Sequence, residues 1–168
     1  MVELTPLDRL QPALLDRLTD DEPSVQVETR ERRVLTKSQL RAAVLRDLGW
    51  IMNATRLAAT EDLSAYPEVE RSVINFGLPA FSGETASTLD VGDLERAIRE
   101  AILRFEPRIL AETLNVEAIT QDSVLNWHNV VSVKISAQLW AQPVPLELLL
   151  RTEVDLETGQ VELADANA

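Results

Sequence analysis

The residues that could do chemistry in this chain are concentrated in the segment Arg104-Phe105-Glu106-Pro107-Arg108. A glycoside hydrolase needs two carboxyl groups roughly 5 to 10 Å apart, one of them kept protonated by its surroundings. Glu106 is the candidate acid because it follows an apolar helix face. Arg104 and Arg108 argue against that role, since nearby cations lower the pKa of a carboxyl group. No second carboxylate stands out, and aromatic residues, which could stack on sugars, are only 4% of the chain.

The same segment is better suited to ion pairing. Arginine forks form strong bidentate hydrogen bonds with carboxylates, and Pro107 fixes the direction of the chain. One hypothesis is an internal brace that ties the helix end to the sheet. The other is a pair of charged groups that contact another protein, since arginine is enriched at interface hot spots. We expect an assembly contact at Arg104, Glu106, Pro107 and Arg108 rather than an active site.

No other motif predicts catalysis, a metal or a cofactor. His128 is the only histidine, and one histidine cannot build a multi-histidine metal site. The serines are scattered without a Gly-x-Ser-x-Gly elbow, and the five glycines form no phosphate-binding loop. We therefore expect no catalytic residue, no metal ligand and no cofactor.

Composition narrows the class of partner. The 168 residues include 28 acidic and 16 basic side chains, a formal charge of −12, which disfavours binding to nucleic acid or to anionic membranes. There is no cysteine, as in many proteins of reducing compartments. We see neither a signal peptide nor an apolar run long enough to span a bilayer, so we expect a cytoplasmic protein that binds other proteins.

Two helices must position the charged segment. Thr36 and Gln39 form a capping box before a helix over residues 37 to about 58, and a second helix runs from about Asp90 to Phe105, where Pro107 ends it. Their apolar positions recur at helical spacing. These positions are Leu40, Val44, Leu48, Ile51 and Met52 in the first helix, and Leu94, Ile98, Ala101, Ile102 and Phe105 in the second.

The sequence then changes to a period of two, which predicts strands over 131–139 and 146–154, with a weaker strand over 114–119 and a turn at Thr158-Gly159. Because helices precede strands, we predict an α+β fold: two main helices packed on a small C-terminal antiparallel sheet of about three to four strands. We divide the chain into an N-terminal extension, residues 1–35, with a short amphipathic helix, and a single α+β domain, residues 36–168.

Two further segments are candidates for binding. In the extension, Leu10, Leu14, Leu15 and Leu18 share one face of a short helix, which either packs on its own domain or docks on a partner. Residues 60–89 form a long loop in which Pro67 can start a helical turn and Gly77 can take a positive φ. A loop of this length is a functional candidate or a packed Ω-type loop.

Three parts of the sequence resemble a known family. They are residues 14–18 with Asp21-Glu22-Pro23, residues 38–53 (SQLRAAVLRDLGWIMN) followed by 72–79 and Ser82-Gly83, and residues 98–108 (IREAILRFEPR). They resemble the TssE family, baseplate subunits of the bacterial type VI secretion system, and the wider family of baseplate wedge proteins of contractile phage tails. Some members of this family are labelled lysozyme-like, so a peptidoglycan hydrolase is a second hypothesis, and a phage or tailocin wedge subunit is a third.

The resemblance implies a structural role without catalysis, in a baseplate docked on the membrane. It implies binding to the TssF–TssG wedge, contact with TssK, and help in starting sheath assembly at the first TssB/TssC ring, by strand addition at an exposed sheet edge. It assigns the wedge contact to Glu106, Pro107 and Arg108. From the resembling segments we add the following partner-binding candidates: Arg104, Asn75, Gly77, Leu14, Asp16, Arg17 and Leu18.

Overall fold

The computed structural model describes residues 12–19, 23–24, 34–81, 90–119, 130–141 and 144–166. Four groups of residues singled out above lie outside these ranges: Leu10, Asp21-Glu22, Ser82-Gly83 and His128.

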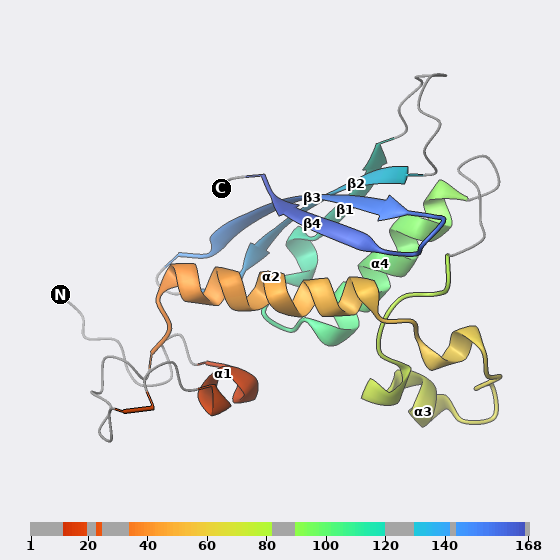
Figure 1. Ribbon diagram of the computed structural model, residues 1–168, viewed down its shortest axis with the longest axis horizontal. Helices are drawn as coiled ribbons and strands as arrows, with labels where there is room; N and C mark the ends of the chain where they lie inside the picture. Colours follow the sequence, from red (N-terminus) through yellow and green to blue (C-terminus); the bar gives the residue numbers. More distant parts are fainter. Residues whose placement is uncertain are drawn as a thin grey trace.

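The C-terminal part of the chain forms a four-stranded antiparallel sheet in the order β1-β2-β3-β4 (Figure 1). The strands are β1 (Asn115–Ile119), β2 (Val130–Leu139), β3 (Leu146–Asp155) and β4 (Val161–Asp165). The longest pairing joins β2 to β3 from Val130↔Asp155 to Leu139↔Leu146. The predicted α+β class and the predicted strands are confirmed; β4, whose position the sequence had not indicated, follows the turn at Gly159, where φ is 74°.

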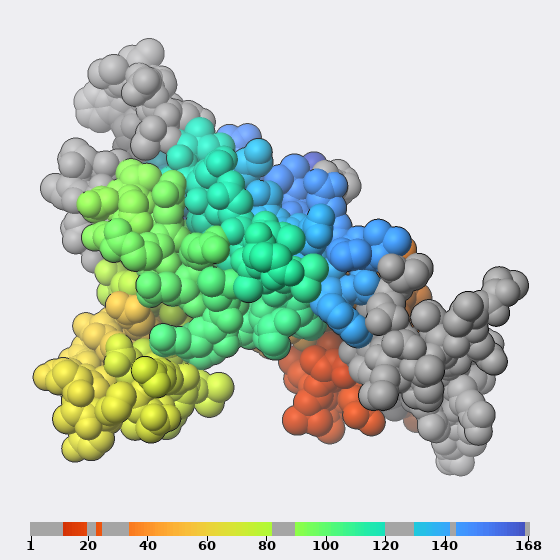
Figure 2. Space-filling model, turned by 180° about the vertical axis from the view of Figure 1, so that it is seen from behind, coloured from red at the N-terminus to blue at the C-terminus, as the bar shows by residue number. Residues whose placement is uncertain are grey.

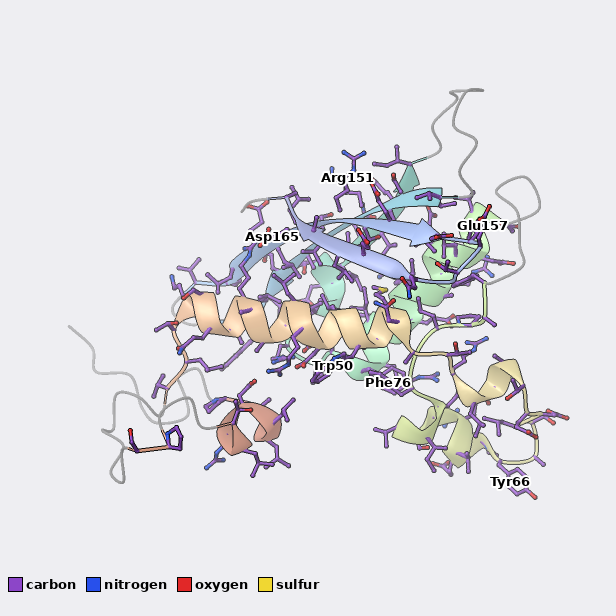
Figure 3. The ribbon with its side chains drawn as sticks, in the orientation of Figure 1. Trp50, Tyr66, Phe76, Arg151, Glu157 and Asp165 are labelled. Atoms are coloured by element: carbon purple, nitrogen blue, oxygen red, sulfur yellow. The ribbon has the colours of Figure 1, made fainter. Side chains whose placement is uncertain are left out.

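Helices cover one face of this sheet. The inward residues of β2 and β3 pack in one core with the apolar stripes of α2 (Lys37–Asn53) and α4 (Val91–Phe105). The other face carries exposed polar residues such as Lys134 and Arg151, and Arg151 points away from the helices (Figure 3). This alternation explains why both strands have a period of two.

Both helices begin where predicted, α2 at the predicted capping box and α4 directly after Asp90. Thr36 accepts from the Gln39 amide at 3.2 Å, and the Gln39 side chain accepts from the Thr36 amide at 2.9 Å. Asp90 accepts from the amides of Gly92 and Asp93 at the start of α4. The first helix ends at Asn53, five residues earlier than predicted, because Thr55 pairs with Leu78 in an isolated β-bridge.

That bridge closes the loop between the helices, which contains α3 (Pro67–Arg71) and the short 3-10 helices η2 (Leu57–Ala59) and η3 (Val73–Asn75). The helical turn predicted at Pro67 is confirmed. Gly77 has φ 111°, and a Cβ there would lie 2.1 Å from the Ala54 carbonyl oxygen. The close approach of two backbone segments therefore requires glycine at this position. The loop projects from the body as a separate lobe (Figure 2).

Both outer strands also lie against helices along their outer edges. On β1, the Ala118 amide donates to Glu95 at 2.7 Å, and Arg99 donates to the Leu114 carbonyl just before the strand. On β4, the Val161 amide and carbonyl both bond the Asn53 side chain at 2.9 Å. Side chains of α4 and α2 thus satisfy backbone groups that a bare edge would offer to another strand.

Within the part of the chain that is described, no helix is both long and apolar enough to cross a membrane.

Candidate protein contact site

Glu106 and Arg108 form a closed ion pair within one turn of chain. Glu106 follows α4 as its C-terminal cap, and its amide donates to the Ile102 carbonyl. Its Oε1 accepts from the Arg108 amide at 3.1 Å and from Arg108 Nε at 2.7 Å, and its Oε2 lies 2.5 Å from Arg108 Nη2. The Glu106 side chain is buried, with a residue exposure of 2%. Pro107 stands between them and is exposed.

Arg108 also reaches a second helix. Its Nη2 lies 2.5 Å from Oδ2 of Asp47 on α2, and Oδ1 of the same carboxylate accepts from Arg46 Nε at 2.9 Å. Arg46 Nη1 in turn lies 2.6 Å from Oδ1 of Asp16. We call the set Asp16–Arg46–Asp47–Arg108–Glu106 the ion-pair chain. It links the end of α4, the middle of α2 and the short helix α1 (Leu14–Leu18).

The charge of Arg108 is stabilised by this arrangement. Burial on its own would lower the pKa of the Arg108 guanidinium, but the hydrogen bonds and charges of Glu106 and Asp47 outweigh it and hold that pKa above its ordinary value. A buried ion pair contributes little net stability compared with an apolar pair, yet removing one partner leaves an uncompensated charge. Glu106, Arg108 and Asp47 therefore act as a structural clamp whose members depend on one another, and Arg46 links this clamp to α1.

This geometry favours the internal brace between the two hypotheses left open for the segment. The Arg108 side chain reaches α2, and the Arg108 carbonyl accepts from the Trp140 amide just after β2 at 2.7 Å. Glu106 is enclosed by its own chain, so in the isolated protein it presents no carboxylate to a partner. Arg104 does not share in the pair: its Nη1 donates to the Glu70 carbonyl at 3.1 Å, on the opposite side of the helix end. Partner binding by Arg104, Glu106, Pro107 and Arg108 stays a prediction.

Asn75 and Gly77 also have roles within the fold. Asn75 is buried; its Oδ1 accepts from the Ala58 amide at 2.8 Å and its Nδ2 donates to the Glu70 carbonyl at 2.9 Å. It thereby connects η2 to the end of α3. Gly77 permits the bridge to Ala54 described above. Their direct contact with a partner is likewise untested, but both are needed to hold the projecting lobe in place.

The candidates in α1 are placed differently. Asp16 binds Arg46, whereas Leu14 and Leu18 are each 74% exposed and Arg17 is exposed. Trp50, 51% exposed, lies on the side of α2 away from the sheet, with Arg46 stacked 5.2 Å from its ring (Figure 3). Among the described residues one ion pair holds this amphipathic helix, and its leucines stay uncovered, which suits docking on another protein.

Sequence reasoning did not single out Arg46, Asp47 or Arg56. The pairing of Asp47 with Arg108 spans 61 positions, which no local pattern reveals. Arg56 is discussed below.

The comparisons with known proteins fit this picture. Residues 38–144 match the family described as "Baseplate wedge protein gp25". The chain belongs to this family. No curated protein and no solved structure gives a match.

As a member of this family, the chain is a structural baseplate protein. The matched region of this wedge protein runs from α2 to the residues before β3, so it contains Asp47, Glu106 and Arg108 but not α1. The geometry at Glu106 argues against its use as a hydrolase acid, because a glutamate buried against Arg108 cannot reach a polysaccharide. Among the described residues there is also no group of three metal-binding side chains.

Proposed function

We propose that this wedge protein is a TssE-type subunit of a type VI secretion baseplate, which binds the TssF–TssG wedge on the cytoplasmic side of the membrane and helps to start the sheath. The observation that carries the proposal is α1. The family match begins after it, at residue 38, yet the ion-pair chain anchors α1 to the core with Leu14 and Leu18 uncovered. The resemblance of this segment to TssE proteins is what favours secretion over a phage tail.

In this proposal the ion-pair chain holds α1 in a fixed position for the contact with TssF–TssG. Glu106, Arg108 and Asp47 hold the end of α4 against α2, and Arg46 extends the same network to Asp16. A docking helix that is already positioned loses less entropy on binding. The Glu-Pro-Arg segment would therefore support the wedge contact from behind, while the leucines of α1 make it.

The proposed contact with the sheath requires a change at one edge of the sheet. Strand addition by a TssB/TssC ring requires a sheet edge with free backbone groups. Asn53 of α2 hydrogen-bonds to Val161 on β4, and Glu95 of α4 hydrogen-bonds to Ala118 on β1. Strand addition would therefore require α2 to release the edge of β4, or α4 to release the edge of β1. We place this step after wedge binding, with TssK as a further neighbour of the assembled wedge.

The test is co-purification with TssF and TssG, followed by measurement of the affinity. Replacing Leu14 and Leu18 together by serine should weaken binding about tenfold or more, with an unchanged melting temperature, since both side chains are exposed. Val144→Ser, at an exposed apolar residue just before β3, is the matched control. Failure of the unaltered protein to bind TssF–TssG would overturn the proposal.

A phage or tailocin wedge subunit is the second candidate, favoured by the description of the matched family. Binding to the wedge proteins encoded by a phage or tailocin gene cluster, in place of TssF–TssG, would establish it.

A further inference from the structure

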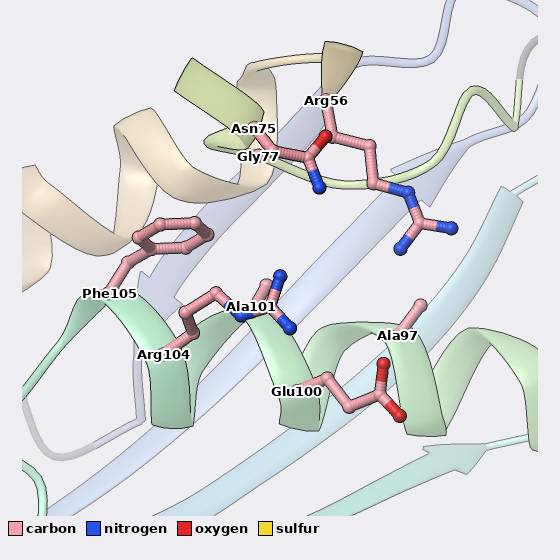
Figure 4. Close-up of a pocket in the computed structure, with 8 residues that line it drawn as sticks. All are labelled: Arg56, Asn75, Gly77, Ala97, Glu100, Ala101, Arg104 and Phe105. Carbon is pink, nitrogen blue, oxygen red and sulfur yellow. The ribbon is translucent and has the colours of Figure 1, made fainter. Parts of the chain in front are cut away.

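A shallow hollow, open to solvent, lies between α4 and the segments that follow α2. Two arginines face it from opposite sides: Arg56 reaches down from the chain after α2, and Arg104 rises from α4, with the Glu100 carboxylate near the rim (Figure 4). Asn75 and Phe105 complete its inner wall. The ion-pair chain described above does not include these residues.

The arginines of the hollow differ from those that brace the core. Arg41, Arg46 and Arg108 each have a carboxylate within 4 Å. Among the described residues neither Arg56 nor Arg104 has one; Arg104 donates to a backbone carbonyl, and the Nε of Arg56 is buried without an acceptor. Arg46 and Arg108 also have a buried nitrogen without an acceptor, so the absence of a nearby carboxylate is what distinguishes Arg56 and Arg104.

Two guanidinium groups and one carboxylate leave a net charge of about +1 in the hollow, on a chain whose formal charge is −12. One additional carboxylate would neutralise it, and the planar forks of arginine match the geometry of a carboxylate. Beside the hollow, η3 exposes Val73 and Ile74, at 78% and 63%. The surface thus combines a cationic recess with an apolar border.

We propose that this recess binds an aspartate or glutamate side chain of a wedge partner, whose neighbouring apolar residues rest on Val73 and Ile74. The inference rests on the proposed function for the identity of the partner. It gives the projecting lobe a binding role separate from that of α1. It also gives a reason why Asn75 and Arg104 both donate to the Glu70 carbonyl, because these bonds fix the position of the lobe relative to the recess.

The experiment measures the affinity of purified TssF–TssG for three variants. Arg104→Glu and Arg56→Gln should each weaken binding about tenfold or more, and more salt should reduce the difference. Arg96→Glu is the matched control, because Arg96 is exposed on the same helix and pairs with Asp93, away from the hollow; it should stay within about twofold of the unaltered protein. Arg104 is exposed, so its variant folds even where Arg56→Gln does not.

A photo-crosslinking residue at Ile74 identifies the bound segment. We expect the crosslinked TssF or TssG peptide to contain an aspartate or glutamate, and its replacement by lysine to restore binding to Arg104→Glu. Equal affinity of Arg104→Glu and Arg96→Glu, or a crosslinked peptide without an acidic residue, overturns the recess while leaving the proposed function intact. Absence of TssF–TssG binding by the unaltered protein overturns both.

Discussion

The Nη2 atom of Arg108 lies 2.5 Å from Oδ2 of Asp47, which is 61 positions earlier in the chain. The same atom lies 2.5 Å from the buried carboxylate of Glu106. One guanidinium therefore joins the end of α4 to the middle of α2. The Glu-Pro-Arg segment, which the sequence suggested as a contact, is in this structure a clamp between the two main helices.

Breaking this clamp should cost stability. Glu106→Gln keeps the shape but removes the more buried of the two carboxylates that compensate Arg108, and Arg108→Ala leaves the buried Glu106 carboxylate without its partner. We expect each to lower the free energy of unfolding by about 3 kcal/mol, measured by chemical denaturation. Glu100→Gln, at an exposed position of α4, is the control and should change it little. If Arg108→Ala is as stable as the unaltered protein but binds no partner, Arg108 is a contact residue instead.

Removing Arg46 should release α1 with little effect on the core. The Arg46–Asp16 pair is partly exposed, so Arg46→Ala should cost only about 1 kcal/mol of global stability. Amide exchange over residues 14–18 should become much faster, because no other ion pair of the described residues ties α1 to α2. Arg96→Ala removes an exposed pair on α4 and should leave exchange in α1 unchanged. Unchanged protection in the Arg46 variant would show that α1 is held by other contacts.

Gly77 and Gly49 offer a matched comparison. Gly77→Ala adds a Cβ that meets the Ala54 carbonyl at a φ of 111°, and should cost at least about 2 kcal/mol. At Gly49, inside α2, an added Cβ meets nothing within 4 Å, so Gly49→Ala should stabilise the protein by about 0.5 to 1 kcal/mol. Thermal melting of the two variants distinguishes them. A neutral Gly77→Ala would mean that the bridge between Thr55 and Leu78 contributes little.

Asn53 should control access to the edge of β4. Asn53→Ala removes the donor and the acceptor that satisfy Val161, and should cost about 2 kcal/mol while speeding exchange of the Val161 amide. Asn53→Asp keeps an acceptor for that amide and should preserve its protection better. If the two variants exchange equally fast at Val161, the side chain does not guard this edge.

Local patterns predicted much of this fold, for identifiable reasons. The caps at Thr36 and Asp90 and the stripes of buried residues depend on neighbours within four positions, so the starts of α2 and α4 could be predicted. Alternation in β2 and β3 reports one buried and one exposed face. The end of α2 could not be found in this way, because the pairing of Thr55 with Leu78 is a contact between distant segments.

The candidate site was harder to predict for the same reason. The sequence placed Arg104 and Arg108 on either side of Glu106, but whether a neighbour pairs depends on where the helix end turns. Arg108 faces the carboxylate and Asp47, whereas Arg104 faces the lobe. Arg56 becomes a candidate binding residue only because the lobe places it opposite Arg104. No spacing in the sequence predicts that arrangement.

The covered edges of β1 and β4 also bear on how copies of this chain behave toward each other before a baseplate exists. A bare strand edge recruits whatever strand comes first, including one from an identical molecule. Glu95 occupies the Ala118 amide and Asn53 occupies Val161, so at these two positions the edges are closed to a strand from a second copy. The same side chains that complete the fold thus also disfavour pairing between identical molecules.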